Sequence, residues 1–531
     1  MEVAQISERF LKSNLSQRQF SVEDNIPRTT LQGHLKRLCK NDGDPVNTFF
    51  ESSAGQVVIH QMMTALVFTF EISHNSGLRK LTQFLELSGF AEYVSHSKSS
   101  LAEYSKEMEN LMIAFGKEQE ERLSKIMPEK KLAIMVDETF PANDICLVTM
   151  DTTSGYLLAE ELSEDRSYKS WQKCIDEAKK RLGIDSFTQI ISDEAKALLK
   201  LAKEENAQHN TDLLHVLLEI SKALSGRLAS QKNQTQKLVD EAVASLEKKK
   251  QHVSSSAHQR ETRVRIAEKI LAEAKALHQI NIDLFFKYKM ARNTISNSLH
   301  PYDIESGQVV TRADVEKALK ESFDIINDIA KPYGKKALKR IAKAEKLIPV
   351  LLDMICYYHH HTNEILEDTD YSEAQIRILK TVIIPAVYML TIAKKKKTPQ
   401  ERQRLENLSN TLLMQIWGED MPPEIDLLTT QQLDKMLKTA TDTVQLFQRS
   451  SSAVEGRNAQ LNLQQHCRHK LSERKLAALT VHHNFFIKRE DGSTAAMRFF
   501  GTKHPCLFEF IKLKISKIGR PRKRNKLELA S

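Results

Sequence analysis

The stretch from Leu132 to Asp193 constrains the fold of this chain more than any other. It begins with an apolar run, residues 132–136, that ends in Asp137, and a second apolar run, residues 188–192, ends just before Asp193. Apolar runs bounded by polar residues predict strands that are buried on both faces. A carboxylate at the end of each of two such strands is either a turn residue or half of a metal site, and we favour the metal site.

The segments between these aspartates set the order of the elements. Two strands are expected first, at residues 144–151 and 156–162, and then a helix at residues 168–182. Three antiparallel strands, a crossover helix and a fourth strand follow one another in this order in ribonuclease H-like cores. The crossover returns the fourth strand beside the first and parallel to it, so Asp137 and Asp193 are expected at adjacent strand ends.

Two carboxylates this close favour a bound cation. They cannot both stay ionised in a poorly hydrated site without compensation, and a hard divalent cation with oxygen ligands supplies it. We therefore expect Mg²⁺, or Mn²⁺, at Asp137 and Asp193. Two such ions can activate water or a 3′ hydroxyl and stabilise the leaving oxygen when a phosphodiester is displaced.

A third carboxylate is expected from a distant part of the chain, and Glu455 is our candidate. Ser452 and Glu455 also have the spacing of a helix capping box. A capping box alone does not account for the glycine, arginine and asparagine that follow, because glycine near a helix start costs helicity. Arg457 and Asn458 add donors suited to phosphate and are candidates for support of the active site.

The composition excludes several classes of protein. Of 531 residues 41% are hydrophobic and 28% charged, with only 16 glycines and 13 prolines, which is typical of a helix-rich folded protein of several domains. The six cysteines form no Cys-x-x-Cys pair, which argues against a zinc module or a disulfide framework and fits a reducing compartment. The longest apolar stretches, residues 57–72 and 382–393, are too short to span a bilayer, so we interpret both as core helices.

Both ends of the chain carry features that predict DNA binding, in keeping with a net charge of +9. Residues 16–20 open one short helix and Pro27 suits the first position of a second. Polar side chains on the outer face of this second helix could meet a major groove: Arg28, Thr29, Gln32 and Lys36. A plain helical hairpin with a solvated basic face is the alternative.

Near the C-terminus, Arg520 and Arg522 flank a proline as in the centre of an AT-hook, which lies in a narrow minor groove. A basic tail that binds any duplex is the alternative there.

Four blocks of the chain together resemble the signature blocks of bacterial insertion-sequence transposases of the DDE type. They contain the three acidic candidates and a further Asp-His pair: residues 136–139, 191–197, 212–215 and 454–458. Residues 483–485 and 489–498 resemble the C-terminal motif of the same group. The resemblance covers about residues 15–510, and the three acidic blocks in this order are specific as a combination.

The resemblance implies an enzyme that binds element-end DNA and catalyses metal-dependent cleavage and strand transfer during DNA transposition. Asp137, Asp193 and Glu455 would be the catalytic, metal-binding residues. Asp212 and His215 match a block that could support the site; a helix cap and a packed histidine are the alternative. The partners would be double-stranded DNA, at the element ends and the target, and further copies of the chain in the active complex. The implied location is the bacterial cytoplasm, at the nucleoid, without a membrane partner.

The expected fold is mixed and predominantly α, with a ribonuclease H-like α/β core built on a mixed five-stranded sheet. The expected domains are a DNA-binding helix-turn-helix (1–44), a helical domain (45–128), the first part of the core (129–224), a helical insertion (225–445), the second part of the core with the third acidic residue (446–510) and a basic tail (511–531). Three alternatives to a transposase stay open: a ribonuclease H-like nuclease or resolvase without strand transfer, a catalytically decayed transposase that only binds DNA, and a helical scaffold protein.

Overall fold

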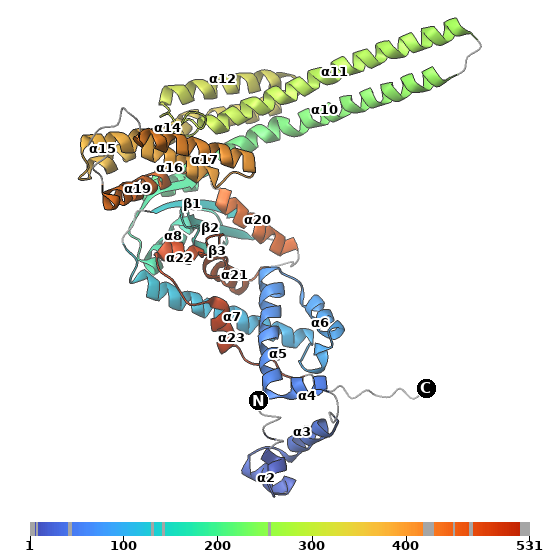
Figure 1. Ribbon diagram of the computed structural model, residues 1–531, viewed down its shortest axis with the longest axis vertical. Coiled ribbons are helices and arrows are strands. Elements are labelled where there is room, and N and C mark those ends of the chain that lie inside the picture. The colour runs from blue at the N-terminus through green and yellow to red at the C-terminus, as the bar shows by residue number, and fades with distance from the viewer. Residues whose placement is uncertain are drawn as a thin grey trace. The chain divides into compact units, whose positions relative to one another are not determined.

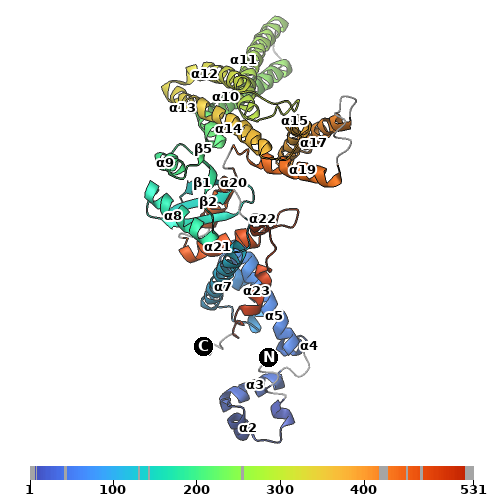
Figure 2. The ribbon, with the colours of Figure 1, turned by 90° about the vertical axis from the view of Figure 1, so that its left-hand side faces the viewer.

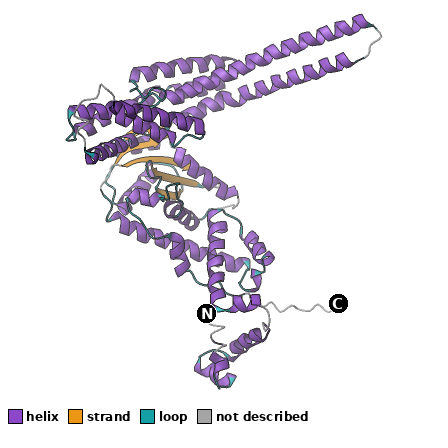
Figure 3. Cartoon of the chain, in the orientation of Figure 1, coloured by secondary structure: helices purple, strands orange, loops and turns teal. Residues whose placement is uncertain are grey.

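The structure is a computed structural model of the chain. It describes residues 6, 9–40, 45–128, 132–140, 144–252, 256–417, 429–449, 452–466 and 471–520. Within these ranges, the side chains of residues 36–40, 45, 51, 452, 455 and 463–466 are not described. Helices predominate over the small group of strands (Figure 3).

The described strands form one five-stranded sheet in the order β3-β2-β1-β4-β5. They are β1 (Leu132–Thr139), β2 (Ile145–Asp151), β3 (Leu157–Ser163), β4 (Phe187–Ser192) and β5 (Gln208–Thr211). β2 and β3 are antiparallel, whereas β4 runs parallel to both β1 and β5. Helix α8 (Tyr168–Leu182) connects β3 to β4, and α9 (Lys196–Glu204) connects β4 to β5. The predicted fold class, predominantly helical with a mixed five-stranded sheet, is therefore confirmed.

The strand positions expected from the sequence agree with the structure to within two residues, and α8 has its predicted bounds. The sequence did not locate β5, because its residues Gln-His-Asn-Thr form neither an apolar run nor an alternating pattern. This strand pairs with β4 from Gln189↔Gln208 to Ser192↔Thr211. The buried side chain of Asn210 also donates to Gln189 Oε1 at 3.0 Å, so polar contacts hold β5 in place.

The chain divides into two compact units. Unit 1 contains Met1–Lys131, Asp137–Ser186 and Ala453–Ser531, and unit 2 contains Leu132–Val136 and Phe187–Ser452. The helices of unit 1, besides α8, are α2 (Gln17–Glu23), α3 (Arg28–Lys40), α4 (Pro45–Glu51), α5 (Ser53–Leu66), the π-helix η1 (Val67–Ser73), α6 (Leu78–Leu87), the 3₁₀ turn η2 (Phe90–Glu92), α7 (Lys98–Ser124), α20 (Ser452–His466), α21 (Glu473–Phe485), α22 (Ala495–Phe500) and α23 (Leu507–Lys514).

Helix α7 is central to unit 1 and packs against α21 and α23 from the other end of the chain (Figure 2). The Phe115 ring of α7 lies edge-on to the ring of Phe485 in α21. The buried ammonium of Lys475, also in α21, is 3.0 Å from Glu71 of η1 and 3.4 Å from Glu109 of α7. A buried cation with two carboxylate partners is satisfied only in this arrangement, so the C-terminal helices are part of the core that the N-terminal helices form.

The first helices contain the predicted helix-turn-helix segment. Phe20 of α2 and Leu31 of α3 are buried against each other with Ile6. Helix α3 begins at Arg28, one residue later than expected, because the Pro27 carbonyl accepts hydrogen bonds from Thr30 and Leu31 and so caps the helix. Two helices with a small apolar core are common to a helix-turn-helix and to a plain helical hairpin, so the DNA-binding motif stays a prediction.

Unit 2 is helical after β5, as expected for the insertion. Its helices, besides α9, are α10 (Leu213–Gln251), α11 (Ala257–Ser298), α12 (Arg312–Ala330), η4 (Lys331–Tyr333), α13 (Lys335–Glu345), α14 (Ile348–Glu367), α15 (Glu373–Ile378), η5 (Leu379–Ile383), α16 (Ile384–Ala393), α17 (Pro399–Met414), η6 (Gln415–Trp417) and α19 (Thr430–Gln445). Helices α10 and α11 form a long antiparallel hairpin, green to yellow in Figure 1. The other helices share one apolar core with the part of this hairpin next to the sheet.

The end of the insertion returns to the strands of unit 2. The Gln189 side chain of β4 donates to the Leu446 carbonyl at 2.8 Å, and the Leu213 N–H at the start of α10 donates to the Arg449 carbonyl at 3.0 Å. The Arg449 guanidinium donates in turn to the Leu299 carbonyl at the end of α11. The chain therefore enters and leaves the helical insertion at the same edge of the sheet.

One described segment, Glu373–Ala393, is long and apolar enough to cross a membrane by length and composition alone. It comprises α15, η5 and α16, and 61% of its most apolar window is buried inside the protein. Leu379, Ile384 and Met389 are fully buried in the core of unit 2. This burial agrees with the expectation of a core helix.

Candidate active site

Asp137 lies near the end of β1, and its carboxylate accepts hydrogen bonds from described residues of β1 and α20. Its Oδ1 accepts from the Glu138 N–H at 3.0 Å, and its Oδ2 accepts from the side-chain amide of Asn458 at 2.8 Å. Asn458 belongs to α20, 321 positions further along the chain (458 − 137). The structure therefore brings the blocks 136–139 and 454–458 together within unit 1.

A buried ion pair fixes α20 against β3. Arg457 donates through Nε and Nη2 to the two carboxylate oxygens of Glu160, both at 2.7 Å, and Thr480 of α21 donates to the same carboxylate at 2.6 Å. The side chains of Arg457 and Glu160 are 5% and 0% exposed. Arg457 thus positions the neighbouring Asn458. From the sequence, Arg457 was a candidate to donate hydrogen bonds to phosphate.

Glu160 and Thr480 are the residues of this site that the sequence did not reveal. Glu161, next along β3, is hydrogen-bonded to Cys174 of α8. Because neighbouring residues of a strand face opposite sides, α8 covers one face of β3 and α20 and α21 cover the other. The signal in the sequence is the alternation of β3, which places Glu160 on the same strand face as the apolar Leu158. An acid on a face that becomes buried needs a cationic partner.

The Asn458 Oδ1 atom, next to the Asp137 carboxylate, is buried and has no hydrogen-bond partner among the described residues. A buried acceptor without a donor costs about 1–3 kcal/mol, and oxygen atoms of this kind are the ligands that Mg²⁺ and Mn²⁺ prefer. The donor set around Asp137 therefore fits a hard divalent cation, or water bound to one.

Glu455 lies in α20, three residues before Asn458. Its side chain, like that of Ser452, lies outside the described residues, so both the metal ligand and the capping box stay predictions. Among the side chains that the structure describes, no group of three or more His, Cys, Asp or Glu residues is arranged to hold a metal ion.

Asp193 follows β4 directly, as predicted. Its Oδ1 accepts from the Ala195 N–H at 2.9 Å, which shapes the turn into α9. The adjacent Glu194 carboxylate accepts a hydrogen bond from Thr211 at the end of β5. Glu194 is therefore engaged by the neighbouring strand.

The register of β1 and β4 relates the two aspartates. Met135 of β1 pairs with Ile191 of β4 in the parallel ladder. Asp137 and Asp193 each follow these paired residues by two positions in the sequence. The convergence of their carboxylates on one cation stays a prediction.

Asp212 and His215 form a local pair at the start of α10. The carboxylate of Asp212 is fully buried; it accepts from the Leu214 N–H and from His215 Nδ1, both at 2.8 Å. Asp212 is thus the N-cap of α10. The His215 side chain is 36% exposed. The Asp212 carboxylate orients its imidazole by binding Nδ1, and Nε2 lies on the side of the ring away from this contact.

The DNA-binding candidates differ in how far they are described. Arg28 and Thr29 are exposed at the start of α3, and Gln32 donates to Gln17 Oε1 of α2 at 3.4 Å. Arg520 is half-buried. The side chain of Lys36 and the whole of Arg522 lie outside the described residues.

The C-terminal block docks on the turn between β2 and β3. Asn484 accepts from the Leu157 N–H at 2.9 Å and donates to its carbonyl at 3.0 Å, in the manner of a paired strand residue. His483 Nε2 donates to the Gly155 carbonyl at 2.9 Å, and Arg498 donates twice to the Ser154 carbonyl. Through these hydrogen bonds the motif binds the turn between β2 and β3 and holds α21 against β3.

Burial depresses the pKa of two adjacent histidines in α21. Burial, together with the smaller effect of the Arg457 cation, lowers the pKa of His482 to about 3 and of His483 to about 4. In the unfolded chain a histidine titrates near pH 6.5. The unfolded state therefore binds more protons below that pH, and stability falls as pH falls.

We expect the free energy of unfolding to drop between about pH 6.5 and pH 4 by up to about 1.4 kcal/mol per pH unit for each of the two histidines. Urea unfolding at several pH values, compared between the wild type and His483→Gln, measures this, because the variant removes one titrating group and should flatten the dependence. An unchanged slope in the variant would show that other groups control the acid sensitivity.

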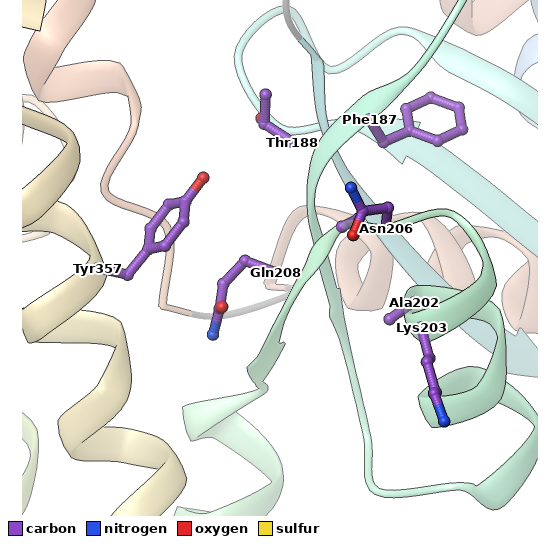
Figure 4. A pocket seen from close by; sticks show the side chains of 8 residues that line it. Phe187, Thr188, Ala202, Lys203, Asn206, Gln208 and Tyr357 are labelled. Atoms are coloured by element: carbon purple, nitrogen blue, oxygen red, sulfur yellow. The ribbon is translucent and has the colours of Figure 1, made fainter. Parts of the chain in front are cut away.

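An open pocket of about 470 Å³ lies in unit 2 at the beginnings of β4 and β5. Figure 4 shows Tyr357 of α14 across from Gln208, with Lys203 on α9. Asp193 lies at the other end of β4, roughly 20 Å away at 3.3 Å per residue. The pocket is therefore separate from the candidate active site.

Residues 379–527 match the model of a family of unknown function, DUF6399. The match spans 149 of 531 residues (527 − 379 + 1) and includes α20 and the C-terminal block. No curated protein matches the chain significantly. Together with the sheet order, which is compatible with a ribonuclease H-like core, these findings concern the fold and leave the activity to be inferred from the site.

Proposed function

We propose that this protein is a transposase that cleaves and joins DNA strands with the help of bound Mg²⁺ or Mn²⁺. The observation that carries the proposal is the hydrogen bond from Asn458 to Asp137. It attaches α20, the helix that contains Glu455, to the end of the strand that contains the first predicted metal ligand. A structural scaffold has no need for this contact between blocks 321 positions apart.

Each residue has a separate role in this proposal. Asp137, Asp193 and Glu455 provide the carboxylates, and positions 455 and 458 share a helix face because they are three residues apart. Asn458 holds the Asp137 carboxylate and leaves its own oxygen available, while Arg457 fixes the helix. The cation, when bound, lowers the pKa of a water or 3′ hydroxyl and stabilises the leaving oxygen of the phosphodiester.

The test is an excision assay on a plasmid that carries the gene's own flanking DNA, with purified protein and Mg²⁺, Mn²⁺ or EDTA. We expect cleavage at the element ends and joining of the 3′ ends to a target, both lost in EDTA. Cleavage without joining would indicate a nuclease or resolvase instead. Binding without cleavage at any metal concentration would indicate a protein that only binds DNA.

The exposed start of α3 is expected to contact the element ends. Arg28→Ala should weaken binding by roughly tenfold, since one lost base or phosphate contact costs about 1–3 kcal/mol. Arg18→Ala removes the same charge from an exposed position on α2 and is the matched control. Fluorescence anisotropy with end and unrelated duplexes at fixed salt measures the effect; equal losses for both variants on both duplexes would leave only nonspecific attraction.

A further inference from the structure

Helix α11 carries a row of exposed apolar side chains along the hairpin. Ile266, Ile270, Leu277 and Ile280 are 52%, 48%, 45% and 63% exposed. Single exposed apolar residues are ordinary on a protein surface. Four along one helix of a hairpin, at regular positions, need a physical explanation.

The row has the spacing of a coiled-coil seam. From Ile266 the steps are four, three, four, three and four residues, through Ile270, Glu273, Leu277 and Ile280 to Leu284. Alternating steps of three and four are those of the a and d positions of a heptad. At 1.5 Å per residue the seam is about 27 Å long, and Glu273 is its one polar member.

The partner helix inside the hairpin does not cover this seam. Helix α10 contacts the face of α11 that borders one flank of the seam, where Ala267 is buried and His278 Nδ1 lies 2.9 Å from Thr235 Oγ1 of α10. At the end of the seam next to the sheet, Leu284 is partly buried against the core of unit 2. The four exposed side chains therefore lie beside the α10 contact and outside it.

The charges beside the seam indicate what covers it. Lys269 and Asp283 hold the same flanking position, g, two heptads apart, with Ala276 between them. The other flank, position e, holds Ala267, Ala274 and Asn281. Facing g positions meet when two helices run antiparallel, whereas g meets e when they run parallel. A second copy in antiparallel orientation thus brings Lys269 of each copy opposite Asp283 of the other, and a parallel copy brings Lys269 opposite alanine.

The same arrangement matches the apolar layers. In an antiparallel pair centred on residue 275, Ile270 faces Ile280 and Ile266 faces Leu284, each twice because of the two-fold symmetry. Glu273 faces Leu277, and Lys269, 4.0 Å from the Glu273 carboxylate on the preceding turn, partly neutralises it. The self-complementary order of both charge and size favours a copy of this chain over an unrelated helix.

We propose that the 266–284 face of α11 is a self-association surface on which two copies of the chain pair their α11 helices in antiparallel orientation. The inference goes beyond the proposed function and does not depend on it, because association can be measured without DNA or metal. A polar residue in a seam fixes the register at a cost in affinity, so Glu273 makes the pairing specific and weak enough to be reversible.

Sedimentation velocity of the full-length protein over a range of concentrations tests the proposal. We expect a concentration-dependent dimer that Ile270→Asn/Ile280→Asn weakens by at least about tenfold, the equivalent of about 1.4 kcal/mol. Phe286→Asn is the control, because Phe286 is 63% exposed on the same helix but outside the repeat. Circular dichroism should show that all variants keep the wild-type helix content, since the altered side chains are exposed.

Charge reversal tests the orientation. Lys269→Glu alone and Asp283→Lys alone should each weaken the dimer, and the double variant should restore it. Glu273→Leu should tighten the dimer by removing a charge from the seam. The proposal is overturned if the wild type and Glu273→Leu both stay monomeric, or if a dimer forms that the isoleucine variants do not weaken. A double charge variant that fails to restore the dimer would overturn the antiparallel pairing.

Discussion

Replacement of Asp137 by asparagine is expected to abolish DNA cleavage and to leave DNA binding intact or tighter. The amide has the shape of the carboxylate and its oxygen can still accept from Asn458, so α20 stays docked. It cannot neutralise a divalent cation, and loss of one essential group from an active site lowers the rate by about 10⁴-fold. Removal of a negative charge also lessens the repulsion of phosphate, which is why binding should not weaken.

The matched control for this variant is Asp176→Asn, which removes the same charge from an exposed position on α8 in the same unit. For both variants we would measure cleavage of element-end DNA, DNA binding by fluorescence anisotropy, and Mn²⁺ binding in the absence of DNA. A loss of Mn²⁺ binding in Asp137→Asn alone separates a metal ligand from a residue that only shapes the turn. Near wild-type cleavage by Asp137→Asn would remove the two-metal mechanism.

The second large effect is expected on stability. Arg457→Met should destabilise unit 1 by about 3–5 kcal/mol, because it leaves the buried Glu160 carboxylate without its cation. Thr480 alone donates one hydrogen bond to that carboxylate and cannot neutralise it. Urea unfolding followed by tryptophan fluorescence measures the loss, since Trp171 is fully buried in α8 of the same unit.

Two comparisons identify the cause. Lys125 pairs with Glu121 at 2.9 Å at the end of α7 in the same unit, and both side chains are exposed, 69% and 76%, so Lys125→Met should leave the stability nearly unchanged. The double variant Arg457→Met/Glu160→Leu should recover much of the stability, because no unpaired charge remains. Equal losses for the single and double variants would assign the effect to lost packing.

Much of the core could be predicted because its signals are local. The apolar runs before Asp137 and Asp193 define two strands, and Gly183 after α8 has the left-handed φ of 66° that ends a helix. The partner of Glu160 could not be predicted, because Arg457 lies 297 positions away and no local pattern specifies a contact over that distance. Asp212 is similar: its cap position follows from the sequence, whereas its full burial depends on how α10 packs.

Unit 1 is built from three separate segments of the chain, and this has a consequence for its folding during synthesis on the ribosome. Lys475 is translated 366 residues after Glu109 (475 − 109), which takes roughly 20–70 s at typical rates of synthesis. Until then the acids Glu71 and Glu109 have no cation from α21, and Glu160 has none from α20. Unit 2, whose residues 187–452 are contiguous, can form its helical core during that interval. In a copy truncated before residue 453, unit 2 would thus keep its helical core, whereas Glu71, Glu109 and Glu160 of unit 1 would lack these cations.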